Sequence, residues 1–245
     1  MKIKVMTFNI HHGKGIDKQS DLYRIAEVID KCNPDIIGLN EVDQHFSRRS
    51  LYEDQTSWIA NQLKMDHAFS PSISIKSKHL IEKRQYGNAL LSRYPIITKK
   101  IHLFKNRSGI NEGRSLIEAT IQINKQLYIV MVTHLSLNLF LHKKQTDFIV
   151  NQSQKYSHPT IIMGDCNMRP GSKGWRKLTD AFQDVWNIGG NGTGYTHPSL
   201  RPRRRLDYIF VSRNLKVVEA DVVTKISKAS DHLPLTATLQ YDSKR

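Results

Sequence analysis

Asp231 and His232 stand side by side near the C-terminus, within a Ser-Asp-His-Leu-Pro run at residues 230–234. A carboxylate can hold a hard cation and an imidazole can take a proton from water, and hydrolysis of a phosphate ester needs both. Asp-His dipeptides are also common in solvated loops, so the pair by itself favours that simpler interpretation. Partners elsewhere in the chain decide between the two.

Other side chains of catalytic type stand where apolar, strand-like segments begin or end. The residues that follow such segments are Asn9, Glu41, His134, Asp165 and Asn167, and Asp207 opens another. Strands that end at one edge of a fold would bring these groups together, where ligands of α/β proteins tend to bind. Singly, each has a simpler interpretation: an exposed strand-end Glu, a structural His, or an Asx turn at 164–167.

Each of these residue types suits a part of phosphate chemistry. Glu41 at the end of a buried strand would be a rigid, charged ligand for Mg²⁺. Asp165 and Asn167 are two residues apart, so on an extended segment both point to one side while Cys166 points into the packing. A carboxylate such as Asp207 can orient an imidazole and stabilise its protonated form.

The segments that would position these groups alternate between helical and strand patterns. Strand character appears near residues 1–10, 36–41, 88–92, 96–97, 116–121, 128–133, 159–164, 206–211 and 235–239. Helical spacing appears at 22–29, with Ser20 as a candidate N-cap and Asn33-Pro34 as a stop, and helices are expected from about residue 54 and over 143–155. Strands mixed with helices indicate an α/β fold with mixed sheets. No linker-like segment divides the chain, so we expect one domain over residues 1–245.

The composition favours an anionic partner. The 37 Lys and Arg residues against 22 Asp and Glu give a formal net charge of +15, which suits nucleic acid, an anionic membrane surface or a phosphorylated metabolite. A merely soluble basic surface is an equally simple interpretation. The two cysteines fit a reducing compartment, and the N-terminal segment alternates like a strand rather than a signal peptide, so we expect a cytoplasmic protein. We infer no protein partner.

Seven motifs occur in the order seen in the endonuclease/exonuclease/phosphatase superfamily, which the chain resembles from residue 5 to about 239. They are Thr-Phe-Asn-Ile at 7–10, Leu-Asn-Glu-Val-Asp at 39–43, Tyr-Gly-Asn-Ala at 86–89, Thr-His-Leu at 133–135, Gly-Asp-Cys-Asn at 164–167, Leu-Asp-Tyr-Ile at 206–209 and Ser-Asp-His at 230–232. The superfamily includes deoxyribonucleases, abasic-site endonucleases, neutral sphingomyelinases and inositol-phosphate phosphatases. The resemblance is closest to its compact bacterial metal-dependent hydrolases.

This resemblance implies a four-layer α/β sandwich, in which two mixed β-sheets pack face to face and helices flank them. It also implies a Mg²⁺ cofactor, with Mn²⁺ as a substitute, and metal ligands at Glu41, Asn9 and Asp231. The motif positions where this chain departs from the usual pattern are Cys166, which replaces a Phe, and Asn40, which replaces a Gln. Both changes leave the charged residues of the motifs in place.

The resemblance further implies the roles of the remaining residues in attack of water on phosphorus. His232 resembles a general base oriented by Asp207, although in some members the residue matching Asp165 activates water. His134 would stabilise the phosphate or protonate the leaving group, and Asn167 would hold a non-bridging oxygen. These assignments leave open which of His232 and Asp165 takes the proton.

The substrate-binding residues predicted from motifs and charge are Arg114, Tyr86, Asn88 and Arg205. Arginine suits phosphate, and Arg205 closes a basic cluster at 201–205 whose simpler interpretation is a solvated loop. The expected substrate is an anionic phosphate ester, nucleic acid being favoured by the charge. The alternative is a phosphodiesterase that acts on a phospholipid or sphingomyelin-type headgroup, or a phosphatase. The lipid substrate is considered because residues 137–141 include four apolar side chains that could contact lipid. A non-catalytic polyanion-binding module is the third hypothesis.

Overall fold

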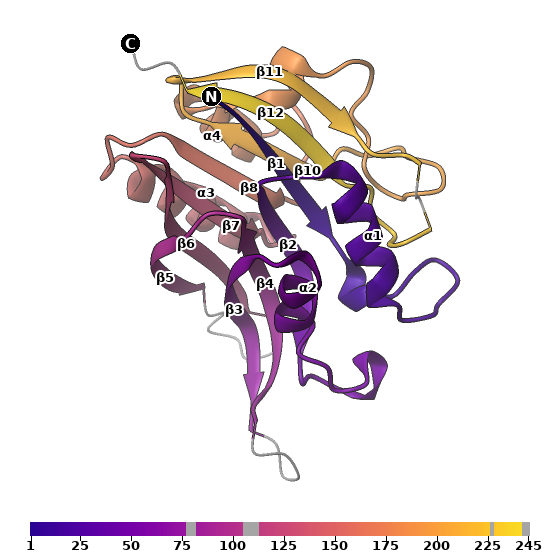
Figure 1. Ribbon diagram of the computed structural model, residues 1–245. Helices are drawn as coiled ribbons and strands as arrows, with labels where there is room; N and C mark the ends of the chain where they lie inside the picture. The colour runs from indigo at the N-terminus through magenta and orange to yellow at the C-terminus, as the bar shows by residue number, and fades with distance from the viewer. Residues whose placement is uncertain (77–81, 105–112, 226–227, 242–245) are drawn as a thin grey trace.

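Two six-stranded β-sheets make up the centre of the computed structural model of the chain (Figure 1). The structure describes residues 1–76, 82–104, 113–225 and 228–241. The first sheet has the strand order β11-β12-β1-β2-β4-β3 and the second has the order β5-β6-β7-β8-β10-β9. Each contains one parallel pair, β1 with β2 and β7 with β8, among antiparallel neighbours. Both sheets are therefore mixed, as expected.

The strands of the two sheets have the following bounds. The first sheet contains β1 (Lys2–Asn9), β2 (Ile36–Gln44), β3 (Asp66–Ile75), β4 (Arg84–Ser92), β11 (Leu215–Val222) and β12 (Leu235–Tyr241). The second contains β5 (Ile96–Phe104), β6 (Arg114–Ile123), β7 (Gln126–His134), β8 (Thr160–Asp165), β9 (Gln183–Asp184) and β10 (Asp207–Val211).

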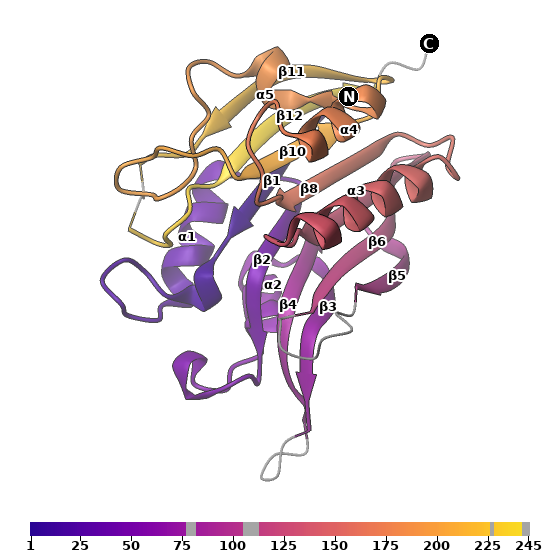
Figure 2. The same cartoon turned by 180° about the vertical axis from the view of Figure 1, so that it is seen from behind.

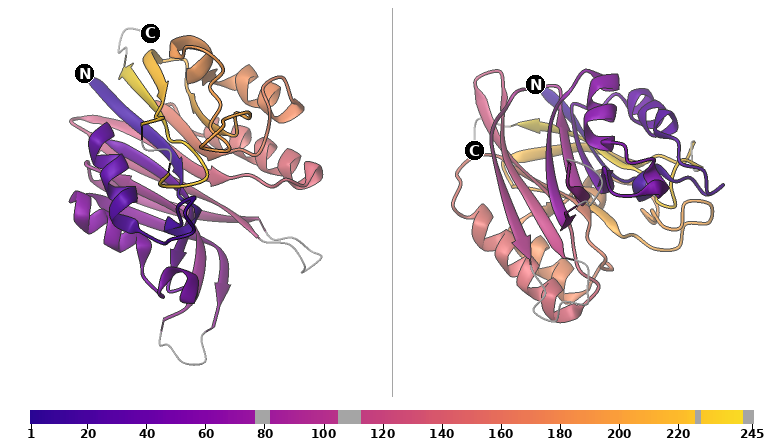
Figure 3. Two further views of the ribbon diagram at one scale, coloured as in Figure 1. Left: turned by 90° about the vertical axis from the view of Figure 1, so that its right-hand side faces the viewer. Right: turned by 90° about the horizontal axis from the view of Figure 1, so that it is seen from below.

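Helices cover the outer faces of the sheets (Figures 1 and 2). The described helices are α1 (Leu22–Cys32), α2 (Gln55–Leu63), α3 (Leu139–Ser153), α4 (Lys173–Ala181) and the short α5 (Val185–Gly189), with 3₁₀ turns at His11–Gly13 and Arg48–Ser50. One apolar cluster lies between the sheets, a second beneath α1 and α2, and a third beneath α3 and α4. Figure 3 shows the layers from two further sides. This arrangement confirms the four-layer α/β sandwich.

The helix boundaries follow from local capping. Asp21, rather than the expected Ser20, caps α1, since its side chain accepts a hydrogen bond from the backbone N–H of Arg24. Asn138 caps α3 in the same way, which starts this helix at Leu139, ahead of the predicted start at residue 143. Side-chain acceptors at the N-cap satisfy backbone N–H groups that the first turn leaves unpaired. Among the described residues, no helix is long and apolar enough to cross a membrane.

Candidate active site

The ends of four strands bring the predicted catalytic residues to one edge of the sandwich. β7 and β8 run parallel with His134 opposite Asp165, and β10 runs antiparallel to β8 with Asp207 opposite Asp165. β1 ends at Asn9 in the other sheet. The loop before β12 is tied to this point because the Ser230 hydroxyl donates a 2.8 Å hydrogen bond to the carbonyl of Asn9. This arrangement agrees with the expectation that the strands bring these polar groups together at one edge of the fold.

Asp165 lies at the centre of the group, and its side chain is buried. Its Oδ2 accepts a hydrogen bond from Asn9 Nδ2 at 3.1 Å, and it lies 3.5 Å from His134 Nε2 and 3.8 Å from His232 Nε2. Asn9 comes from one sheet and Asp165 from the other. One carboxylate oxygen of Asp165 therefore faces three side-chain nitrogens. This arrangement suits a carboxylate that interacts with a positive charge or takes up a proton.

Asn167 and His134 form the next contact outward. Asn167 Nδ2 lies 3.0 Å from His134 Nε2 and also donates to the carbonyl of Leu135 at 3.0 Å. Burial lowers the pKa of His134 to about 4; the nearby Arg114 and His232 lower it and Asp165 opposes the shift. The imidazole is therefore neutral near pH 7, which leaves Nε2 able to accept the Asn167 hydrogen bond.

His232 and Asp207 form a buried pair on the other side of Asp165. Asp207 Oδ2 lies 2.8 Å from His232 Nδ1, and both side chains are buried. Burial lowers the pKa of His232, but the Asp207 carboxylate outweighs it, Asp165 and Asp231 add to the rise, and the pKa reaches about 10. The ring is therefore protonated at neutral pH, and its Nε2 donates rather than accepts.

Glu41 supplies the carboxylate that suits a metal ion. It accepts a 3.0 Å hydrogen bond from Asn9 Nδ2, the same group that donates to Asp165. Burial raises the pKa of Glu41, Asn9 and His11 oppose this rise, and the Asp165 and Asp231 carboxylates add to it. Ligand atoms of Glu41, His134 and Asp165 all lie within 4.8 Å of one another. Because this concentration of negative charge presents oxygen atoms to one point, the residues fit a hard divalent cation.

The backbone at Glu41 and Asn167 adopts a conformation that is unusual for non-glycine residues. Their φ angles are 57° and 47°, in the left-handed region. Glu41 does not end its strand, as the sequence suggests, because β2 continues to Gln44; instead it lies where the pairing of β2 with β4 shifts register. Such an irregularity turns one side chain out of the regular alternation, here toward Asn9.

Two asparagines, Asn40 and Asn88, join the sheets beneath the site, and the sequence did not indicate the role of Asn40. Asn40 Oδ1 accepts from the backbone N–H of Asp165 at 2.7 Å, and Asn40 Nδ2 donates to Asn88 Oδ1 at 2.8 Å. Asn88 Nδ2 donates to the carbonyl of Ser115 at 3.0 Å. Asn40 thus holds the segment that carries Asp165.

The four predicted substrate-binding residues occupy different environments. Arg114 begins β6 and lies close enough to His134 to affect its pKa. Tyr86 packs with Phe46 and with Arg49, whose guanidinium lies 5.3 Å from the Tyr86 ring. Asn88 is 1% exposed and its amide bonds to protein groups on both sides. It therefore lies within the protein rather than on a surface open to substrate.

Arg205 departs furthest from the sequence-based expectation. It is 2% exposed, its guanidinium donates to Asp184 at 2.6 Å, and it lies 4.7 Å above the Tyr208 ring. Replacing water around a buried arginine requires a paired carboxylate, and Asp184 provides it. This ion pair is an internal contact of the fold, so the structure argues against substrate binding by Arg205.

Three histidines near the site were not assigned to it from the sequence. Ligand atoms of His11, His12 and Glu41 lie within 4.8 Å of one another, so both adjacent histidines reach the site. The His197 ring lies 4.7 Å from that of His232. The signal for His197 is weak in the sequence because no strand-like segment precedes it, and only the folding of the 190–206 loop brings it close.

The motif order and this geometry agree with a comparison against known families. A model of the endonuclease/exonuclease/phosphatase family matches residues 6–232. The chain belongs to this family. An uncharacterized relative, the protein YbhP of Escherichia coli K12, is 24% identical over an alignment of 257 residue positions, gaps included. The alignment covers 96% of this chain and 95% of that protein.

Solved structures of family members share the fold. A family member from Beutenbergia cavernae has a TM-score of 0.77 at 23% identity, covering 98% of this chain and 72% of that one. A mannosyl-6-phosphatase of Bacteroides thetaiotaomicron has a TM-score of 0.79 at 16% identity, covering 98% and 100%. The human Nocturnin catalytic domain has a TM-score of 0.74 at 22% identity, covering 98% and 95%. Members of the family are hydrolases that act on phosphate esters.

Proposed function

We propose that this protein is a phosphoesterase that uses Mg²⁺ to hydrolyse a phosphodiester by in-line attack of water. The observation that carries the proposal is the arrangement around Asp165 Oδ2, which Asn9, His134 and His232 approach at 3.1 to 3.8 Å. A buried carboxylate between the donors of Asn9 and His232, beside a second carboxylate that suits a cation, provides the charge pattern that phosphoryl transfer requires.

The metal would be held mainly by Glu41, with Asn9 and Asp231 as further ligands. Glu41 and Asp165 are held 3.0 and 3.1 Å from the single amide of Asn9, so their charges converge on one point. When bound, Mg²⁺ or Mn²⁺ would supply a Lewis acid that offsets the negative charge of the phosphate group.

The roles of the chain's own groups follow from which atoms are free. His232 Nδ1 is occupied by Asp207, so its Nε2 is the ring atom that faces the site, where it would donate to a phosphoryl oxygen. Asp165, which faces the donors of Asn9 and His232, would take the proton of the attacking water. His134 and Asn167 would contact a non-bridging oxygen or the leaving oxygen of the phosphate group. Of the predicted substrate contacts, we retain Arg114 and Tyr86.

A substrate panel tests the proposal. Purified protein is incubated with Mg²⁺, with Mn²⁺ or with EDTA, and with bis(p-nitrophenyl) phosphate, p-nitrophenyl phosphate, DNA, RNA, phospholipid and inositol phosphates. Hydrolysis that needs the cation is expected, and Glu41→Gln should reduce it by about 100-fold or more. The matched control is Glu27→Gln, at an exposed helical position whose carboxylate pairs with Lys31. Turnover that persists in EDTA, or no hydrolysis of any substrate, would exclude the proposal.

A further inference from the structure

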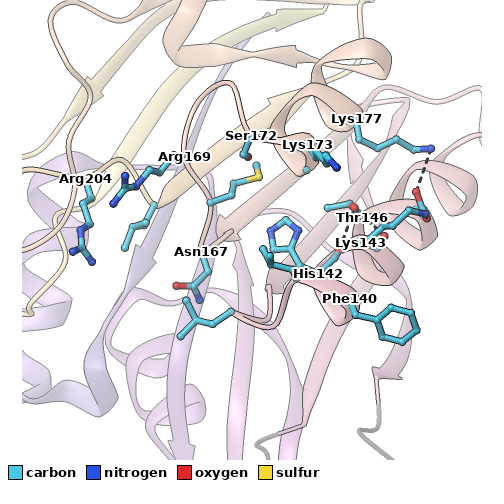
Figure 4. Close-up of a pocket in the computed structure, with 16 residues that line it drawn as sticks. Phe140, His142, Lys143, Thr146, Asn167, Arg169, Ser172, Lys173, Lys177 and Arg204 are labelled. Atoms are coloured by element: carbon cyan, nitrogen blue, oxygen red, sulfur yellow. Dashed lines mark hydrogen bonds and ion pairs between the residues drawn. The ribbon is translucent and has the colours of Figure 1, made fainter.

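A groove of about 930 Å³ opens beside the proposed site, between the start of α3 and the segment that leads into α4 (Figure 4). Asn167 lines this groove and also contacts His134, so the groove and the catalytic residues share a boundary. Arg204 and Leu206, just before Asp207, line it as well. A molecule in the groove would therefore extend to the point where a phosphate is hydrolysed.

The groove is bordered by large apolar side chains that face solvent. Leu137, Leu139 and Phe140 are 73%, 86% and 64% exposed, and they follow directly after β7 and its terminal His134. Exposed apolar side chains gathered at one place commonly mark a surface that binds another apolar surface. These three side chains form the apolar tip of this face. The hydrophobic core does not depend on them, because α3 packs on its sheet through other residues, among them Ile149 and Val150.

Cationic side chains surround the same apolar tip. The groove is lined by Lys143, Arg169, Lys173, Lys177 and Arg204 against the single carboxylate of Asp147. Asp147 pairs with Lys143 at 2.7 Å and with Lys177 at 3.2 Å, so one carboxylate serves two of these cations. Lys144 Nζ lies 4.2 Å from the centre of the Phe140 ring. Apolar side chains surrounded by an excess of positive charge match a surface that is both apolar and anionic.

We propose that this α3–α4 face, made of Leu137, Leu139, Phe140, Lys143, Lys173 and Lys177, docks on an anionic phospholipid surface. The leucines and Phe140 would enter the acyl region while the lysines contact headgroup phosphates, since long cationic side chains keep their charge in water as their stems pack against apolar groups. The proposal deepens the proposed function, because docking would bring a lipid phosphodiester to the groove and so to Asn167.

The chemistry of the tip favours lipid over a polynucleotide. Bases of single strands bind by stacking on aromatic rings, but two of the three exposed side chains are aliphatic, and Lys144 lies over the Phe140 ring. Aliphatic side chains gain by entering hydrocarbon. Binding of a polynucleotide at this face is therefore the competing outcome that the experiment must detect.

The experiment measures binding of the full chain to vesicles in EDTA, so that no turnover is required. Vesicles of phosphatidylcholine containing phosphatidylglycerol should sediment the protein, and pure phosphatidylcholine vesicles should do so much less. The double variant Leu139→Ser with Phe140→Ser should weaken binding by about tenfold or more, because both contacts with hydrocarbon are lost. Tyr23→Ser is the matched control, since Tyr23 is 70% exposed on α1, which covers the other sheet.

Folding of the double variant is checked by circular dichroism and thermal melting. The single variant Leu137→Ser, outside the helix, gives a second test of the same face. Equal binding by the variants and the unmodified protein, or absence of vesicle binding, overturns the proposal. The proposal is also overturned if these variants bind single-stranded RNA more weakly than the unmodified protein does but bind vesicles equally well. Since binding is read without hydrolysis, a protein that docks on vesicles but hydrolyses nothing separates failure of the proposed function from failure of this inference.

Discussion

The contact between Asp207 and His232 determines what His232 can do. Asp207 lies 2.8 Å from Nδ1 and belongs to β10, whereas His232 belongs to a loop of the other sheet's last hairpin. Because Asp207 is buried, its charge acts on the imidazole with little screening by water. The pair thus fixes both the direction of the ring and its protonated state, and Asp207 acts as a positioning residue.

Removing the charge of Asp207 should therefore change His232 before it changes the fold. In Asp207→Asn, we expect hydrolysis to fall by about 100-fold or more. The pKa of His232, about 10 in the unmodified protein, should fall toward the ordinary value of about 6.5. Activity with a soluble phosphodiester and an NMR titration of the ring in EDTA measure the two effects.

The matched control is Asp221→Asn, at an exposed position of β11, which should leave both quantities unchanged. An Asp207→Asn protein that folds, loses activity and keeps the high pKa would show that the carboxylate does not act through His232.

At the scale of elements, hydrogen bonds between inner strands of the two sheets support the site. Asn40 and Asn88 lie on neighbouring strands of one sheet and bond to Thr133, Asp165 and Ser115 of the other. These hydrogen bonds are buried, so losing one leaves a polar group without compensation from water. The same bonds set the position of β8 relative to β2, and hence of Asp165 relative to Glu41.

Asn88→Ala should consequently affect stability rather than substrate affinity. The change removes the donor to Ser115 and the acceptor of Asn40 Nδ2, and we expect the free energy of unfolding to fall by about 2 kcal/mol. Urea unfolding measures this loss, and Asn61→Ala, at an exposed position of α2, is the control. A variant with unchanged stability and a raised KM would instead return Asn88 to the substrate-binding residues.

The sequence predicted the strands that carry the site better than the elements around them. Apolar runs such as 36–39 and 128–133 are buried on both faces, so their composition alone marks them as strands. β5 was recognised only at Ile96 and Ile97 because most of its side chains face solvent at a sheet edge. No helix was predicted over α4 from the sequence, although Trp175, Leu178 and Ala181 recur at helical spacing and pack against the third apolar cluster. The helix has only nine residues, and so short a pattern is a weak signal.

The parts of the site that depend on contacts between distant segments could not be predicted from the sequence. Asn9, Glu41 and Asp165 were predicted as site residues because they stand at the ends of strand-like segments of the sequence and within the motifs. The bonding of Asn40 to Asp165 joins residues 125 positions apart, and the burial of Arg205 depends on Asp184. No local pattern in the sequence reports either contact, because each is decided by how the sheets and loops pack.

At the scale of the whole molecule, burial acts on the pKa of His12, His134 and His232 in the same direction, but neighbouring charges decide the net shift. Burial lowers the pKa of His134 to about 4 and that of His12 to about 3, because the charged form of an imidazole is costly away from water. In His232 the Asp207 carboxylate overcomes the same cost. Since its pKa is raised, the stabilisation by His232 is complete below pH 6.5 and is lost only as the pH rises through about 10.

The fold should therefore lose stability in acid through His134 and His12 and not through His232. Their folded-state pKa values lie below the unfolded value of about 6.5. As the pH falls, the unfolded chain therefore binds protons at these histidines that the folded chain does not bind. For His134 the loss between pH 7 and pH 5 should be about 2 kcal/mol. Urea unfolding in EDTA at the two pH values should show this loss, and His134→Gln should reduce it by that amount. An equal pH dependence in both proteins would mean that the His134 ring can be protonated in the folded state.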